Sequence, residues 1–384
     1  MLINQKRIAI NTLISAEQNN YTGFSKFDAL NSQLLKKLSF NNKWLRLLYT
    51  QLIKESPVNL RPLFKVKQSK NPKGIALFAR AYFFLFQDTN NTLYLNKGIA
   101  LIEWLLKNPS PNQKKLCFGY NFIWQNTIFL QDLYEPNAVV STFVGEALIH
   151  AYQVTQNQKY LNAAISIACF ISEDLPVLYE NNNERAIAYV LRKVDAIVLN
   201  NQVLTGAFLA KVSQITGSQK LHSIAKKQIN YTVNKKTNYH AWYYTYPSRK
   251  SHITHDNYHT GGILDGILEY FEATGDDQFM DSYWKGLVYY HHYLFEPCGA
   301  PRWMNNQKFP FDIHGAAQGI ITFKKASLYQ SDYLYHAEKI VCWTIKNLYR
   351  KKTNDFAYRI GRFVKWNYSL MRWCNAWISC ALAQ

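Results

Sequence analysis

The sequence lacks several features that would place it in a well-marked class. No charge-free apolar run approaches the ~20 residues that a membrane-spanning helix needs. There is no GxGxxG turn after a strand and no P-loop, and the six cysteines show neither CxxC nor Cys/His spacing of the zinc type. We therefore expect no membrane span, no cofactor and no metal. The scattered cysteines are expected to be buried free thiols in a reducing cytoplasm.

Acidic residues are also scarce, with 25 Asp and Glu against 44 Lys and Arg and a formal net charge of +19. Such a balance favours an anionic partner or reflects a biased genome. Nucleic acid is not expected, because no helix-turn-helix, RNA-recognition or zinc-finger signature accompanies the dispersed lysines. Aromatic residues make up 15 % of the chain, and their faces stack on pyranose rings. A glycan, acidic in character, is the expected partner, while the sequence gives no oligomeric state.

A repeated plan organises the chain. Segments that open at Gly74, Gly145, Gly206, Gly262 and Gly315 each begin with a small-residue-rich apolar stretch. Each then breaks at a polar tract such as TQNQK or TGDDQ and continues with a second stretch of period near 3.6. This pattern predicts five αα-hairpins.

The number of hairpins indicates how they assemble. Residues 32–55 are expected to form another hairpin, and residues 368–383 a closing helix, which gives a ring of about six pairs. We therefore predict an all-α (α/α)6 toroid with one domain over residues 1–384, on which residues 1–30 pack as an N-terminal extension. An open solenoid is the alternative. The long, chemically individual connections and the small residues that open each first helix favour the crowded inner layer of a ring.

Polar and aromatic residues gather just before the helices expected to form the inner layer. These clusters contain Tyr120, Trp124, Gln125, Asn126, Asp132 and Glu135; Asp195, Asn200, Asn201 and Gln202; His252, His255, Asp256, Tyr258 and His259; Arg302, Trp303, Asp312 and His314; and Trp366, Asn367, Tyr368, Arg372 and Trp373. In a ring they would line one rim. The inner-helix N-termini would offer partial positive charge there to a carboxylate, a phosphate or a developing oxyanion.

From these clusters we assign candidate roles. Candidate catalytic residues are Asp256, Asp312, His259, His314 and Tyr258. Candidate substrate-binding residues are Tyr120, Trp124, Gln125, Asn126, Asn201, His255, Trp303, Tyr368 and Arg372. The competing interpretation is structural: Asn137, Asn201 and Asp312 would cap helices, and His314 would be a satisfied core histidine.

Several motifs carry a family resemblance. They are YTGFSKFDALNS, FGYNFIWQ, EPNAVVSTFVGEALIHAY, HDNYHTGGILDGILEYFEATGD, FPFDIHGAAQGI and MRWCNAW. With them the chain resembles a group of (α/α)6 proteins associated with bacterial and archaeal surface-polysaccharide biosynthesis. It is more distantly similar to carbohydrate-active toroids: unsaturated glucuronyl hydrolases, sugar 2-epimerases, uronate C5-epimerases and polysaccharide lyases. The resemblance implies a toroid fold and a carbohydrate-active context.

Three functions remain open at this point. Glycoside hydrolysis needs two carboxyl groups about 5–10 Å apart, which Asp256 and Asp312 would supply from separate rim loops, and it is the first choice. A uronate lyase or C5-epimerase instead needs a Tyr or His base and a cation such as Arg372 beside the acid group. A non-catalytic glycan-binding protein of a polysaccharide pathway is the third.

Overall fold

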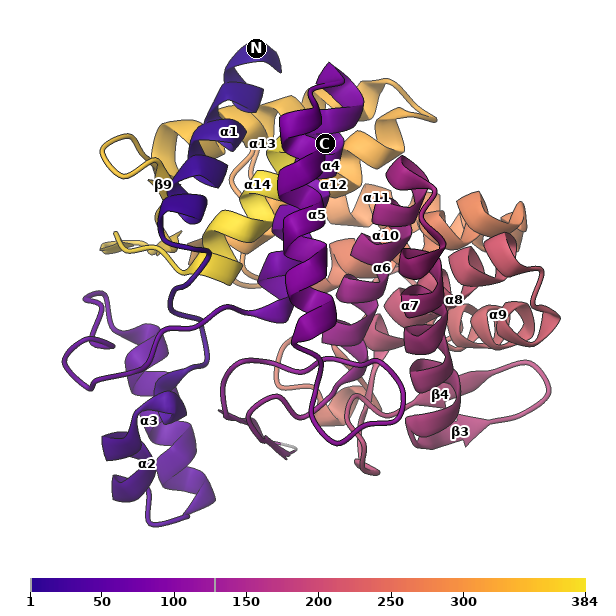
Figure 1. Ribbon diagram of the computed structural model, residues 1–384, viewed down its shortest axis with the longest axis horizontal. Helices are drawn as coiled ribbons and strands as arrows, with labels where there is room; N and C mark the ends of the chain where they lie inside the picture. The colour runs from indigo at the N-terminus through magenta and orange to yellow at the C-terminus, as the bar shows by residue number, and fades with distance from the viewer. Residues whose placement is uncertain (1, 128) are drawn as a thin grey trace.

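A closed double ring of helices forms the body of the computed structural model, which describes residues 2–127 and 129–384 (Figure 1). The inner ring contains α4 (Pro72–Thr89), α6 (Ala138–Thr155), α8 (Leu199–Thr216), α10 (Asn257–Thr274), α12 (Ile313–Ser327) and α14 (Trp377–Ala383), the last preceded by the π-helical η5 (Met371–Ala376). The outer ring contains α1 (Leu2–Gln18), α5 (Thr92–Lys107), α7 (Gln158–Cys169), α9 (Gln219–Val233), α11 (Met280–Leu294) and α13 (Asp332–Leu348). The predicted all-α (α/α)6 toroid is confirmed.

Burial separates the two layers. Inner helices are buried around most of their circumference. In α8, for example, most residues from Leu199 to Ser213 are buried. Outer helices bury one stripe, as in α13, where Ala337, Ile340, Val341 and Thr344 follow the i, i+3, i+4, i+7 spacing. The apolar periodicity of each segment therefore decides its layer.

Glycines permit the close approach of neighbouring inner helices. A Cβ on Gly145 of α6 would lie 2.4 Å from the ring of Phe208 on α8. A Cβ on Gly266 of α10 would lie 2.9 Å from Cβ of Val203, also on α8. The expectation that the small residues of the first helices serve a crowded inner layer is thus confirmed at Gly145 but is wrong at Gly262, where a Cβ would have no described neighbour within 4 Å.

Ring closure differs in one respect from the sequence-based prediction. Helix α14 packs against both α4 and α12, and α1 covers its outer side, so α1 is the outer partner of the last inner helix. The predicted hairpin at residues 32–55 does form, as α2 (Gln33–Leu38) and α3 (Lys43–Glu55), but it is not a ring pair. It projects from the ring at the lower left of Figure 1 and has its own small core of Ala29, Leu35 and Ile53.

The connections that precede inner helices carry the short strands. They are β1 (Trp124–Gln125), β2 (Leu130–Gln131), β3 (Val177–Glu180), β4 (Arg185–Ile187), β5 (Ile197–Val198), β6 (Thr245–Tyr246), β7 (Phe311–Asp312), β8 (Tyr349–Arg350), β9 (Asp355–Phe356), β10 (Arg359–Ile360) and β11 (Lys365–Trp366). Antiparallel pairs join β1 to β2, β3 to β4, β5 to β6 and β8 to β9, while β10 lies between β11 and β7. Single turns are η1 (Ala29–Asn31), η2 (Phe170–Asp174), η3 (Ser248–Lys250) and η4 (Asp277–Phe279).

Two further observations concern the first expectations. None of the described helices is both long and apolar enough to cross a membrane. Cys117, Cys374 and Cys380 are buried as expected, whereas Cys298 and Cys342 are exposed, so the prediction of buried cysteines is wrong for these two. Cys298 lies in the turn between α11 and β7, and Cys342 is not part of the buried stripe of α13.

Candidate functional site

A cavity of about 300 Å³ lies at the end of the ring where the inner helices begin. Every inner helix contributes to its wall, from Lys73 on α4 to Trp377 on α14. Every connection that precedes an inner helix contributes as well, from Lys26 in the first to Trp373 in the last. The connections therefore meet at one rim, as their position before the inner helices predicts.

Aromatic side chains form much of the cavity wall. The Trp124 ring stacks on Phe27 with centroids 5.5 Å apart and meets Tyr120 edge-on at 6.1 Å. The hydroxyls of Tyr120 and Tyr189 lie 3.2 Å apart, and burial raises the pKa of Tyr189 well above its ordinary value. The wall thus combines flat apolar faces with neutral hydroxyl groups, a combination that suits sugar rings.

Asp256 positions His259 toward the cavity. Asp256 is the N-cap of α10 and is only 1 % exposed, and its Oδ1 accepts a hydrogen bond from His259 Nδ1 at 3.0 Å. His259 itself lines the cavity, with the Tyr244 ring 4.4 Å away. Because Nδ1 is engaged by the carboxylate, Nε2 is the nitrogen left for a ligand.

His314 is the second imidazole in the wall, near the start of α12. Its ring lies parallel to Tyr258, with centroids 4.6 Å apart and an interplanar angle of 7°, and edge-on to Trp373 at 4.3 Å. Burial, reinforced by nearby cations, lowers the pKa of His314 well below its ordinary value, so the ring is neutral. Its Nδ1 is buried with no hydrogen-bond partner in the described chain. Tyr258 also lies 4.4 Å from His259, so one tyrosine ring separates the two imidazoles.

Basic side chains outnumber acidic ones in the cavity wall. Lys26, Lys54, Lys73 and Arg372 line it, and no Asp or Glu does among the residues that the structure describes. The Nζ of Lys73 lies 3.7 Å above the Phe143 ring with no carboxylate partner in the described chain, and burial lowers its pKa well below 10.5. Burial also lowers the pKa of Arg372, whose Nε is buried without a hydrogen bond in the same described part. These unpaired donors favour a ligand with an anionic group.

Lys26 and Asp312 form a buried pair at the edge of the cavity. Lys26 Nζ lies 3.5 Å from Asp312 Oδ2 and 3.7 Å from the centre of a Trp373 ring, and burial lowers its pKa to about 7. Asp312 Oδ1 accepts hydrogen bonds from the backbone N–H of His314 at 2.9 Å and from Trp373 Nε1 at 2.7 Å. The Asp312 carboxylate is therefore occupied as the N-cap of α12 and as an anchor for the wall.

A second buried ion pair fixes the backbone around Lys26. Arg61 Nε donates to Asp28 Oδ1 at 2.7 Å, and both side chains are almost fully buried. Arg61 Nη2 also donates to the carbonyl oxygens of Ser25 at 3.0 Å and Lys26 at 3.2 Å. The N-terminal segment is thus held over the cavity by charged hydrogen bonds.

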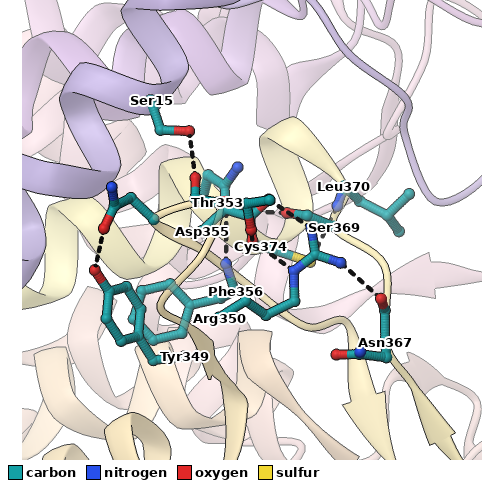
Figure 2. A network of polar contacts seen from close by, with 12 residues as sticks. Ser15, Tyr349, Arg350, Thr353, Asp355, Phe356, Asn367, Ser369, Leu370 and Cys374 are labelled. Carbon is teal, nitrogen blue, oxygen red and sulfur yellow. Dashed lines mark hydrogen bonds and ion pairs between the residues drawn. The ribbon is translucent and has the colours of Figure 1, made fainter.

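A polar network supports the chain that leads into η5, as Figure 2 shows. Arg350 forms two hydrogen bonds with Asp355, at 2.6 and 2.9 Å, and donates to the Asn367 carbonyl at 2.6 Å. The side-chain Oδ1 of Asn375 accepts a hydrogen bond from Ser369 Oγ at 3.0 Å. This network orients the segment that carries the cavity residues of η5.

Carboxylates on the inner helices lie in a second, smaller cavity of about 50 Å³. Five lining residues are shared with the larger cavity, so the two are neighbours along the ring axis. Glu146 and Glu269 pair with Lys211 at 2.7 and 2.8 Å, and Asp265 lies 3.7 Å from Lys325. The acidic groups of the ring interior are therefore neutralised by lysines away from the aromatic cavity.

The structure places most of the predicted site residues in the cavity wall. Those that line it are Tyr120, Trp124, Gln125, Asn126, Tyr258, His259, Trp303, His314 and Arg372. Those that do not are Asp256, Asp312, Asn201, His255 and Tyr368, and neither do Asp132, Glu135 and Asp195.

Three of the predicted substrate-binding residues lie within the fold instead of in the cavity wall. Asn201 lies within the first turn of α8 and is fully buried, so it is neither a cap nor a wall residue. His255 Nδ1 donates a hydrogen bond to the Trp242 carbonyl at 2.9 Å, because a carbonyl oxygen can only accept, and His255 Nε2 lies 2.9 Å from the Tyr239 hydroxyl. The Tyr368 hydroxyl donates to the Ser56 carbonyl at 3.2 Å. These hydrogen bonds hold His255 and Tyr368 away from the cavity, whereas the Asn201 amide is buried without a hydrogen-bond partner among the described residues.

Several wall residues were not among the candidates derived from the sequence. They include Lys26, Lys73, Tyr189, Tyr244 and Trp377. Lys73 could have been predicted from the sequence, because it lies in the first turn of α4, just after the N-cap Asn71. The other clusters likewise lie at the start of an inner helix. Tyr189 precedes α8 and Tyr244 precedes α10 by no more residues than Tyr120 precedes α6, so their position before an inner helix was a signal for these two as well.

Comparisons with known proteins bear on the fold. No protein-family model matches the chain. No curated protein matches it either. Among solved structures, an unsaturated glucuronyl hydrolase specific for heparin is similar with a TM-score of 0.66 at 13 % identity, over 99 % of this chain and 95 % of that one.

Two further solved structures share the architecture. Cellobiose 2-epimerase from Bacillus thermoamylovorans B4167 is similar with a TM-score of 0.64 at 12 % identity, over 83 % of this chain and 90 % of that one. A GH76 α-mannanase from Bacteroides thetaiotaomicron is similar with a TM-score of 0.62 at 14 % identity, over 81 % and 84 % of the two chains. At such low identity these likenesses show the (α/α)6 fold.

Proposed function

We propose that this protein is a carbohydrate-active enzyme that moves a proton at the carbon next to the carboxylate of a uronate-containing sugar, as an epimerase or a lyase does. The observation that carries the proposal is the pair of imidazoles, His259 and His314, in a cavity wall with four Lys and Arg side chains and no carboxylate among its described residues. Solved structures of the same fold include, by their names, a glucuronyl hydrolase and sugar epimerases, which supports a sugar as the substrate.

The proposed step assigns a role to each charged group. Neutral His314 removes the proton, and the electron pair left on carbon is delocalised into the substrate carboxylate. Arg372 and Lys73 bind that carboxylate and stabilise the charge that develops on it. His259, oriented by Asp256, returns a proton to the carbon for epimerisation or to the leaving oxygen for elimination.

Hydrolysis by Asp256 and Asp312, the first choice from the sequence, has weaker support. A hydrolase needs one carboxyl group as an acid and a second as a base or nucleophile beside the glycosidic bond. Asp256 is engaged with His259, and Asp312 with Trp373 and Lys26. Neither lines the cavity, whereas the imidazoles do.

The test is incubation of the protein with oligosaccharides that contain glucuronate in deuterated water, followed by NMR and mass spectrometry. Deuterium at C5 without cleavage would identify an epimerase, and a product with near-ultraviolet absorbance would identify a lyase. Reducing ends without exchange would identify a hydrolase and overturn the proposal.

Variants connect the activity to the two imidazoles. His314→Gln and His259→Gln are each expected to lower turnover about 10²- to 10⁴-fold, the usual contribution of a general acid or base. The matched control is His150→Gln, which changes a buried histidine of α6 that does not line the cavity. Equal activity losses in all three variants would contradict specific roles for His259 and His314.

A further inference from the structure

The α2–α3 hairpin exposes an unusual set of large apolar side chains. Phe40 is 79 % exposed, Trp44 71 %, Leu48 58 % and Leu52 48 %. Trp44, Leu48 and Leu52 follow one another at intervals of four residues on α3, so they share one face of the helix. Leu34 and Leu38 on α2 and Val58 and Leu63 after α3 are exposed as well.

These side chains are not needed for the core of the hairpin. Leu35 and Ile53 are buried there, together with Ala29, and Tyr49 and Leu60 pack against them. The exposed residues point away from this core. Large exposed apolar surface on a projecting element is typical of an interaction site.

Charge around the apolar face indicates what it binds. Residues 33–70 contain nine Lys and Arg but a single acidic residue, Glu55. Lys36, Lys37 and Lys43 are exposed next to the apolar side chains. Glu55 is paired with Arg359 and Lys54, so it does not offset the exposed lysines.

This combination fits one occupant better than others. A second copy of the chain would bring the same positive hairpin, or another part of a molecule whose net charge is +19, against it. A nucleic acid would satisfy the lysines but offers no hydrocarbon for the leucines. An anionic lipid bilayer provides both acyl chains for the apolar face and negative headgroups for the lysines.

We propose that the α2–α3 hairpin docks this protein on the surface of anionic lipid bilayers. Phe40, Trp44, Leu48 and Leu52 enter the interfacial layer, and Lys36 and Lys37 with their basic neighbours lie at the headgroups. The association is peripheral, because it uses side chains of a short helical pair. It does not depend on the reaction proposed for the cavity.

Docking through this hairpin would place the cavity beside the membrane. Leu47, Gln51 and Lys54, on the neighbouring face of α3, line the cavity. Lys43 Nζ donates to the Thr127 carbonyl at 2.8 Å, which ties the start of α3 to the loop between β1 and β2. A glycan presented at a membrane surface would therefore lie next to the cavity.

The experiment is co-sedimentation of the full chain with vesicles of phosphatidylcholine, with and without one third phosphatidylglycerol. We expect binding to the anionic vesicles and little to the neutral ones, and weaker binding as ionic strength rises. Phe40→Ser/Trp44→Ser/Leu48→Ser should reduce binding at least tenfold, and Lys36→Glu/Lys37→Glu by about fivefold or more per lysine. Circular dichroism checks that each variant folds.

The matched control is Leu328→Ser/Phe363→Ser, which removes apolar side chains that are 79 % and 86 % exposed elsewhere on the surface. It should bind anionic vesicles as the wild type does. Brominated lipids should quench part of the tryptophan fluorescence, and Trp44→Phe should abolish that part.

Three results would overturn the proposal. The first is equal binding to neutral and anionic vesicles, and the second is full binding by the triple serine variant. The third is that light scattering shows a dimer for the wild type and a monomer for the triple serine variant, while the wild type does not bind vesicles. That result would assign the exposed face to a second copy of the chain.

Discussion

Replacement of Lys73 by methionine should make the protein more stable and its binding of acidic sugars weaker. Lys73 is buried in the cavity wall, and no acidic group pairs with it in the described chain. Burial holds its pKa well below 10.5, so folding either strips its proton or buries an unpaired charge. Methionine fills a similar volume without that cost.

The expected gain in stability follows from comparable substitutions. Replacement of buried ion pairs by apolar residues is neutral or stabilises proteins by about 1–4 kcal/mol, and an unpaired lysine lacks the partner that offsets part of its desolvation cost. An unfolding entropy of ~2.1 cal/mol/K per residue, taken over the 384 residues, turns this into a rise in Tm of roughly 1–5 °C.

The gain should also depend on pH. The folded-state pKa of Lys73 lies below the unfolded value, so the unfolded chain binds the proton more strongly. Wild-type stability should therefore rise relative to the variant as pH increases toward about 10.5, and the difference should shrink over that range.

Binding should change in the opposite direction. A hydrogen bond from a charged lysine to a carboxylate contributes about 1.5–3 kcal/mol, so affinity for glucuronate should fall roughly tenfold to a hundredfold or slightly more. Affinity for glucose should stay unchanged, since glucose has no carboxylate. Calorimetry with both sugars and thermal unfolding at several pH values provide the assay.

Lys324→Met is the matched control. Burial lowers the pKa of Lys324 to about 8, and its Nζ donates to the Ala381 carbonyl at 3.1 Å, away from the cavity. This variant should leave sugar binding intact. A destabilised Lys73→Met protein that binds glucuronate with wild-type affinity would refute the reasoning on both counts.

Three other predictions follow from buried polar groups. Asp256→Asn should lower turnover about 10²- to 10⁴-fold while circular dichroism stays unchanged, and full turnover would show that orientation of the imidazole is unimportant. Burial lowers the pKa of His150 to about 3, so the free energy of unfolding of the wild type should fall by up to about 1.4 kcal/mol per pH unit below about 6.5. Urea unfolding of His150→Gln should show a smaller fall over the same pH range. Arg61→Met leaves the buried Asp28 carboxylate unpaired and should lower stability by about 3–5 kcal/mol. Hydrogen exchange over residues 23–70 measures this loss, and Arg61→Met/Asp28→Asn should recover part of the lost stability.

Much of the ring could be predicted because each helix carries its own periodicity. The stripe at Ala337, Ile340, Val341 and Thr344 is visible in the sequence and decides which side of α13 is buried. The hairpin at residues 32–55 shows the limit of that reasoning, because its helical pattern is correct but its place outside the ring is not visible. Local periodicity predicts an element, while its neighbours depend on what else competes for the same surface.

The candidate site was predicted in outline for a similar reason. Polar residues before inner helices reach the same rim in any such ring, so His259, His314 and Arg372 appear in the cavity wall. The sequence could not decide between a capping role and a catalytic role for Asp256 and Asp312, because a helix N-cap and a cavity-facing acid have the same sequence pattern. Only their hydrogen-bond partners distinguish the two.

The sequence by itself determined five of the helical pairs, their order and the loops that meet at the rim, because each is a local property of the chain. Tertiary structure alone decided that the cavity wall carries cations and imidazoles while the interior carboxylates pair with lysines elsewhere. Which groups face a common space depends on distances between segments far apart in the chain. Burial and pairing of charges, and with them the chemistry available, are settled only when those segments meet.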